Sequence, residues 1–162
     1  MLHSIPNPTR KITVNFSIDK VKQAIKDFPL LKKKYNLFEA HDTIGFYKLD
    51  ALEFLSFGVY VDINLSEISE TKTEIAIEIR RKVGTFDEWQ EVSRAGDHIN
   101  NLITGLGQLL EKPELSGQLQ KAKVEKEAQL EIEKKKTPVG LLVFAGLAVV
   151  FLIMVVALVA SV

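Results

Sequence analysis

The chain has 162 residues with 21 basic and 21 acidic side chains, and it contains no cysteine. The absence of cysteine excludes disulfides, thiolate metal sites and cysteine nucleophiles. Because there is no surplus of cations to displace counterions from phosphates, we expect no nucleic-acid partner. Two prolines interrupt the first residues and no apolar stretch follows them, so we expect no signal peptide.

The first expected elements are a strand and a helix. In ITVNF, apolar and polar residues alternate, which predicts a strand. Ser17 or Asp19 can cap the helix that follows, because either side chain accepts hydrogen bonds from free backbone N–H groups. Apolar residues then recur at helical spacing, and Pro29 is expected to end or restart the helix.

Several antiparallel strands are expected next. Two short ones are predicted at Leu37–His41 and Ile44–Leu49. In LSFGVYVDINL, apolar residues occupy every second position, and a second alternation follows the turn SEISET. This pattern predicts an antiparallel hairpin with one apolar face and one solvated polar face. Asp62 and Glu78 belong to the polar face, and we expect them to approach each other across the hairpin.

A long helix is predicted at the end of this domain. Thr85 and Glu88 have the spacing of a capping box. Apolar residues follow at helical spacing, which predicts about 25 residues of helix from Phe86. Trp89, the only tryptophan, falls in the first turn of this predicted helix. We expect it to plug one end of the fold; the alternative is a contact surface for a membrane or a partner.

No motif in the sequence indicates catalysis. It contains no phosphate loop, dinucleotide fingerprint, zinc-protease motif or nucleophile elbow. Asp97 and His98 are adjacent, but neighbouring helical residues point about 100° apart, so we expect His98 at the surface. Glu39, His41 and Asp42 lack a second histidine to complete a metal site. We therefore predict no catalytic residue, no metal site and no cofactor.

The order of a strand, a helix, antiparallel strands and a long last helix resembles the START-like family, also called SRPBCC, with its helix-grip fold. The resemblance is carried by ITVNFSIDKVKQAI and TEIAIEIRRKVGTFDEWQEVSRAGDHINNLITGLGQLL, and it covers residues 11–110. It implies an α+β domain in which an antiparallel sheet wraps around the long C-terminal helix and holds an apolar ligand. The candidate cavity residues are Phe57, Val59, Val61, Ile75, Ile77, Ile99, Ile103 and Leu106. Alternatively, these side chains simply fill a solid core.

The C-terminal third of the chain separates into a tether and an anchor. Residues 112–137 are predicted as a charged, partly helical tether, in which Pro113 and Gly117 break any helix arriving from residue 111. Residues 138–162 carry no charge and exceed the roughly 20 residues that span a bilayer, so we predict a transmembrane helix. By the positive-inside rule, the N-terminal domain is cytoplasmic and the C-terminus lies on the far side of the membrane. The lysines expected at the membrane surface are Lys134, Lys135 and Lys136.

These segments predict a tail-anchored, single-pass membrane protein, with a flexible N-terminus at residues 1–9 and a START-like domain at residues 10–111. Its expected function is to bind an apolar small molecule, a lipid or similar, at the surface of the lipid bilayer. One alternative is a non-catalytic adaptor that recruits a protein partner to the membrane, which would have a filled core. The other is a cyclase- or hydrolase-like enzyme, which would bury polar groups at a pocket.

Overall fold

The computed structural model describes residues 5–53 and 57–136. The chain divides into two compact units, residues 1–120 and 121–162. The elements follow one another as β1 (Thr9–Val14), α1 (Ile18–Leu31), β2 (Tyr35–His41), β3 (Phe46–Ala51), β4 (Val59–Ser69), β5 (Lys72–Arg81), α2 (Trp89–Glu111) and α3 (Pro113–Lys136).

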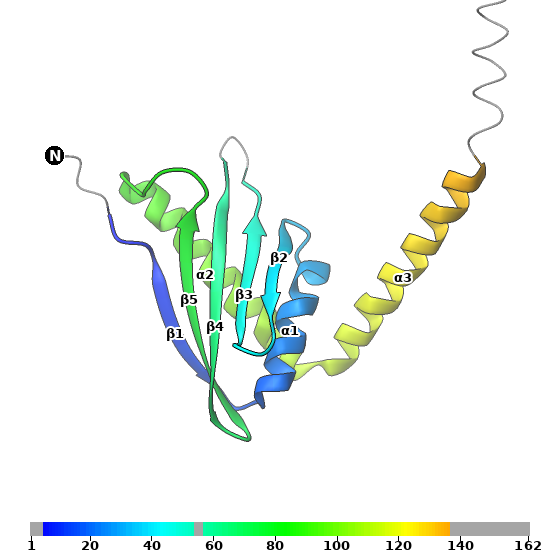
Figure 1. The fold of residues 1–162 in the computed structure, drawn as a ribbon, viewed down its shortest axis with the longest axis horizontal. Coiled ribbons are helices and arrows are strands. Elements are labelled where there is room, and N and C mark those ends of the chain that lie inside the picture. The colour runs from blue at the N-terminus through cyan, green and yellow to red at the C-terminus, as the bar shows by residue number, and fades with distance from the viewer. Residues whose placement is uncertain (1–4, 54–56, 137–162) are drawn as a thin grey trace, which may run out of the picture. The chain divides into compact units, whose positions relative to one another are not determined.

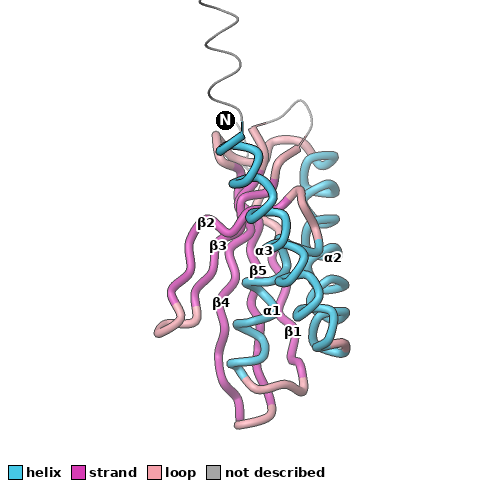
Figure 2. Tube along the Cα trace, turned by 90° about the vertical axis from the view of Figure 1, so that its right-hand side faces the viewer, coloured by secondary structure: helices cyan, strands magenta, loops and turns pink. Residues whose placement is uncertain are grey.

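The five strands form one antiparallel sheet in the order β1-β5-β4-β3-β2. Figure 1 shows β1 and β2 at its two edges, and Figure 2 shows that α1 and α2 lie on the same face of it. The core lies between this face and the two helices, and it contains aliphatic residues together with Phe28 and Tyr35. This is the predicted α+β arrangement, in which an antiparallel sheet packs on the long helix α2.

The hairpin of β4 and β5 has the predicted inner face. Val61 pairs with Ile79, and both side chains are buried against the helices. On the outer face Asp62 lies opposite Glu78, as predicted. Asp62 is nevertheless buried, and not solvated as expected, because the Arg80 guanidinium lies over it and forms an ion pair with it.

The predicted alternation fails at the beginning of this hairpin. β4 begins only at Val59, because Gly58 has a φ of +78°, a conformation that glycine adopts without steric cost. A Cβ atom at position 58 would lie 2.4 Å from the carbonyl oxygen of Ala51, so no other residue fits there. Phe57 therefore does not share the inner face with Val59, and its side chain is 73% exposed.

The two helices that cover the sheet differ from the prediction at their ends. α1 continues past Pro29 to Leu31, because proline removes only its own N–H donor and the N–H of Lys32 still donates to the carbonyl of Phe28 at 2.9 Å. α2 begins at Trp89 with Glu88 as its N-cap, and no side chain caps it, so the predicted capping box does not form. Phe86 lies before the helix, is buried, and accepts a backbone hydrogen bond from Ile5 at 2.8 Å. Phe86 thus closes this end of the core, whereas Trp89 is 75% exposed.

The predicted helix break after α2 is a junction between two helices. α3 begins at Pro113, directly after the C-cap of α2 at Lys112, and Gly117 lies inside it. Proline is favoured at a first helical position because its missing N–H would have no helical partner there. Leu115 and Leu119 pack against the core of the first unit, so the first turns of the predicted tether belong to the domain.

The predicted membrane anchor, residues 138–162, lies outside the described residues. Lys134, Lys135 and Lys136 are the last residues of α3, and their place at a membrane surface stays a prediction. Among residues 5–53 and 57–136, no helix combines the length and the apolar character that crossing a bilayer requires.

Candidate ligand site

An apolar groove lies between the C-terminal half of α2 and the strands β1 and β5. Its volume is about 380 Å³, within the range of roughly 300–1,000 Å³ typical of small-molecule sites. Two polar residues, Asn15 and Glu111, also contribute to the lining. The apolar side chains that line the groove are Ile12, Val14, Phe16, Ile75, Ile103, Leu106 and Leu110.

The groove follows from the periodicities of two elements at the sheet edge. Ile103, Leu106 and Leu110 are spaced by three and four residues, so they lie on one face of α2. Ile12 and Val14 are two residues apart on β1 and face the same side of the sheet. These side chains pack against the core, but most of them remain partly exposed. The face of the helix and the edge of the sheet therefore leave an apolar space between them.

Gly107 keeps this space open on the helix side. It lies inside α2, where a glycine costs about 1 kcal/mol relative to alanine. A Cβ atom built at this position has no neighbouring atom within 4 Å. Packing therefore does not require glycine here, and a larger side chain would project into the free space beside the groove lining.

The predicted cavity residues separate into three groups. Ile75, Ile103 and Leu106 line the apolar groove. Phe57 and Val59 line a different, smaller pocket near the N-terminal end of α2. The other predicted residues line neither space and are buried in the core: Val61, Ile77 and Ile99. Contact of these residues with a ligand stays a prediction.

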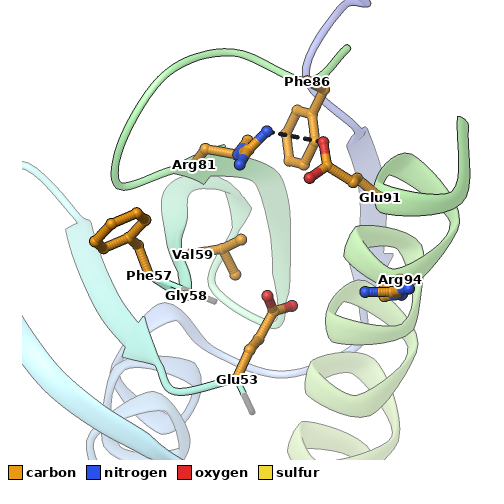
Figure 3. A pocket seen from close by; sticks show the side chains of 8 residues that line it. All are labelled: Glu53, Phe57, Gly58, Val59, Arg81, Phe86, Glu91 and Arg94. Carbon is orange, nitrogen blue, oxygen red and sulfur yellow. Dashed lines mark hydrogen bonds and ion pairs between the residues drawn. The ribbon is translucent and has the colours of Figure 1, made fainter. Parts of the chain in front are cut away.

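The smaller pocket has a volume of about 40 Å³, which is too little for a lipid. Figure 3 shows it between the end of β5 and the start of α2, with Arg81 and Glu91 directed toward each other. Arg81 Nη1 and Glu91 Oε2 are 2.8 Å apart. Glu53 and Arg94 also line an adjoining recess of about 320 Å³, which we call the polar recess. Its lining residues are Lys34, Leu52, Glu53, Arg94, Asp97 and His98.

A chain of three polar side chains leads from the polar recess into the core. His98 Nε2 lies 2.9 Å from Glu53 Oε1, and His98 Nδ1 lies 2.9 Å from the hydroxyl of Tyr35. Because a carboxylate only accepts hydrogen bonds, we assign the proton of a neutral imidazole to Nε2, and Tyr35 then donates to Nδ1. Burial raises the pKa of the Tyr35 phenol, which keeps it protonated as a donor.

The prediction that His98 lies at the surface is wrong, since its exposed fraction is only 4%. A sequence signal for its position exists. His98 follows Ala95 by three residues and precedes Leu102 by four, so it belongs to the apolar stripe of α2. Its bonding to Glu53 had no such signal, because the two residues are far apart in the sequence. Among the residues that the structure describes, no three acidic or histidine side chains converge to hold a metal.

Comparisons with known proteins give information on the fold alone. No protein-family model matches the chain. A search among curated protein sequences found no relative. Among solved structures, an uncharacterized protein from Bacillus thuringiensis is similar, with a TM-score of 0.51 and 10% identity over 65% of this chain and 98% of that chain.

Two further solved structures align with lower scores. A START superfamily protein from Mycobacterium smegmatis has a TM-score of 0.43 and 10% identity, over 65% of this chain and 97% of that chain. The Zhui aromatase/cyclase from a Streptomyces species has a TM-score of 0.43 and 9% identity, over 67% of this chain and 93% of that chain. The sheet order and the long helix α2 agree with the predicted α+β, helix-grip arrangement, and the first likeness shows that this fold also occurs in another protein.

Proposed function

We propose that this protein holds an apolar ligand, a lipid or a similar molecule, in the apolar groove, at the cytoplasmic surface of a membrane that anchors its C-terminal segment. The observation that carries the proposal is the groove itself, with its volume of about 380 Å³ and its mainly aliphatic lining. Burial of apolar ligand surface is worth roughly 25 cal/mol per Å². Asn15 and Glu111 would contact the polar end of such a ligand.

The C-terminal sequence supports the proposed location. Residues 138–162 are uncharged and long enough to span a bilayer, and three lysines lie just before them, separated from them only by Thr137. An apolar ligand has its highest concentration in the bilayer, so an anchor keeps the groove close to its source. The location and the ligand together describe a membrane-bound lipid binder.

The test is to identify the molecules that copurify with the chain. The full chain is purified in a mild detergent, bound lipid is extracted, and the amount per chain is measured by mass spectrometry. We expect Gly107→Leu to lose most of the bound lipid, because the added side chain enters the groove. Ile103→Trp is a second occluding variant, and it should give the same loss.

Gly117→Leu is the matched control for Gly107→Leu. Both glycines lie inside helices, and a Cβ atom meets no neighbour within 4 Å at either position, but only Gly107 lines the groove. Bound lipid should therefore remain in Gly117→Leu. Equal loading of Gly107→Leu and the unaltered chain would show that the groove is not the binding site. An unaltered chain without bound lipid would favour the adaptor.

A second candidate function is a cyclase- or hydrolase-like enzyme, and one observation favours it. Such an enzyme requires polar groups buried at a pocket. The hydrogen-bonded side chains Glu53, His98 and Tyr35 are such groups, and two of them, Glu53 and His98, line the polar recess. A carboxylate held by a buried imidazole can accept a proton from a substrate. Chemical conversion of the extracted molecule by the unaltered chain, but not by Glu53→Gln, would establish this function instead of simple binding.

A further inference from the structure

Four large apolar side chains are exposed at one end of the sheet, and we call them the apolar rim: Leu52, Phe57, Val83 and Trp89. The strand register brings three of them to the same end of the sheet. Ala51 pairs with Val59, and Val59 pairs with Arg81, so Leu52, Phe57 and Val83 lie just beyond these pairs. Trp89 begins α2, and Glu91 in the same turn pairs with Arg81. Figure 1 shows the termini of these strands at one end of the sheet, where the connection from β5 to α2 also begins.

The exposure of the apolar rim is not explained by packing within the domain. Phe86 already closes the core at this end, and Gly58 directs Phe57 away from the inner face. Trp89 and Phe57 are the two most exposed of the large hydrophobic residues in the described part of the chain. Large apolar side chains that gather on a surface mark a site of contact with a partner or a membrane.

The charges beside the apolar rim limit the kind of surface that it can contact. Arg81 pairs with Glu91 and Asp87, and Lys82 pairs with Asp50, so these cations are neutralised locally. A further carboxylate, Glu88, precedes Trp89 directly. Two more cations, Lys34 and Arg94, line the recess beside Leu52 together with two carboxylates, Glu53 and Asp97. The rim therefore carries no excess of positive charge that would attract acidic lipids. Its contact must depend on the insertion of apolar and aromatic groups.

We propose that the apolar rim inserts into the interfacial layer of the bilayer to which the chain is anchored; this inference rests on the proposed function. The sequence of residues 138–162 favours a bilayer over a protein as the occupant. Beyond the first unit, α3 continues over residues 121–136, a rise of about 24 Å, which is short enough to keep the domain within reach of an anchoring membrane. Tryptophan suits this layer because its ring is apolar and its N–H can remain hydrated.

Trp89 allows a direct test because it is the only tryptophan in the chain. The full chain is reconstituted into vesicles of phosphatidylcholine, either unlabelled or brominated on the acyl chains close to the headgroup. Flotation of the vesicles first shows whether the chain is anchored. We expect at least a twofold loss of Trp89 fluorescence in brominated vesicles, because bromine quenches an indole only at close contact. Added salt should leave the quenching unchanged.

Two substitutions separate insertion of the rim from mere proximity to the bilayer. Val83→Asp should abolish the quenching while the chain still floats with the vesicles. Ile68→Asp is the matched control, because Ile68 and Val83 are both 55% exposed but Ile68 lies at the opposite end of β4. Quenching should persist in Ile68→Asp. Quenching that survives in Val83→Asp would overturn the insertion of the rim.

The remaining outcomes distinguish this inference from the proposed function. If the chain floats and Trp89 is not quenched, the anchor stands and the insertion of the rim is overturned. If the chain does not float, the anchor and the rim contact fail together. If Trp89 becomes shielded from acrylamide as the protein concentration rises, with no effect of lipid bromination, the rim binds a protein surface, which also overturns the inference.

Discussion

Two glycines of α2, Gly105 and Gly107, have opposite roles although they lie on the same helix. A Cβ atom at Gly105 would lie 2.4 Å from Cε2 of Phe28, whose ring is fully buried, whereas at Gly107 it would meet nothing. We expect Gly105→Ala to lower the free energy of unfolding by about 1–3 kcal/mol through overpacking. Gly107→Ala should raise it by up to about 1 kcal/mol, because alanine is the better helix former.

Thermal unfolding of the full chain in non-ionic detergent measures both effects. The melting temperature should fall for Gly105→Ala and stay level or rise for Gly107→Ala. Since the two substitutions are chemically identical and occur in one helix, their difference isolates the contact with Phe28. Equal shifts in the two variants would show that α1 and α2 do not pack closely at this position.

His98 shows how one residue can connect a pocket to the core. Its imidazole accepts from Tyr35 and donates to Glu53, so neither ring nitrogen is left without a partner. An unpaired buried polar group costs about 1–3 kcal/mol, and the two partners avoid this cost. The same bonds fix the orientation of Glu53 at the polar recess. His98 is therefore both a core residue and a positioning group for a carboxylate beside open space.

At the scale of elements, a carboxylate joins α1 to the β2–β3 hairpin. Asp42 accepts a hydrogen bond from Lys26 Nζ on α1 and another from the hydroxyl of Tyr47 on β3, each at 2.6 Å. These two hydrogen bonds hold the pKa of Asp42 below its ordinary value of 3.8, and the bond from Lys26 has the larger effect. The ionised form of Asp42 therefore stabilises the folded chain.

This junction predicts a dependence of stability on pH. Because the pKa of Asp42 is lowered by folding, its contribution is complete above 3.8 and is lost as the pH falls through the folded-state value. The unaltered chain should melt at a higher temperature than Asp42→Asn at pH 6, and the difference should disappear at acidic pH. Asp19→Asn, an exposed change on α1, is the control and should give little difference. A difference that persists at pH 2 would contradict the role of the charge.

The elements were predictable where apolar residues recur with one period along a segment. They were not predictable where a single residue or a contact distant in sequence determines the local structure. Alternation located the inner face of β4 and β5, because side chains of a strand alternate between two faces. It failed at Phe57, where the left-handed conformation of Gly58 interrupts the pattern. The helical stripe of α2 contained the groove residue Ile103 and also His98. Nothing in the local pattern indicated that Glu53 would meet His98.

At the scale of the whole chain, the boundary of the first unit is set by a contact that joins residues distant in sequence. The unit ends at Gln120, inside α3 and beyond the predicted boundary at residue 111. Asp27 of α1 is buried, and it accepts hydrogen bonds from Ser116 Oγ and from Gln120 Nε2, the latter at 2.9 Å. Gln23 donates a third at 3.0 Å. We call Asp27, Ser116 and Gln120 the clasp.

The clasp predicts where α3 changes from a docked helix to a tether. Asparagine offers one acceptor oxygen where Asp27 offers two, so Asp27→Asn should lose at least one bond of the clasp, worth about 1–3 kcal/mol. In hydrogen exchange of the full chain, residues 113–120 should be protected more than residues 121–131, whose side chains are exposed. Asp27→Asn should reduce that protection about ten- to hundredfold, and Asp19→Asn should not. Unchanged protection in Asp27→Asn would mean that the apolar contacts of Leu115 and Leu119 alone hold the start of α3 on the domain.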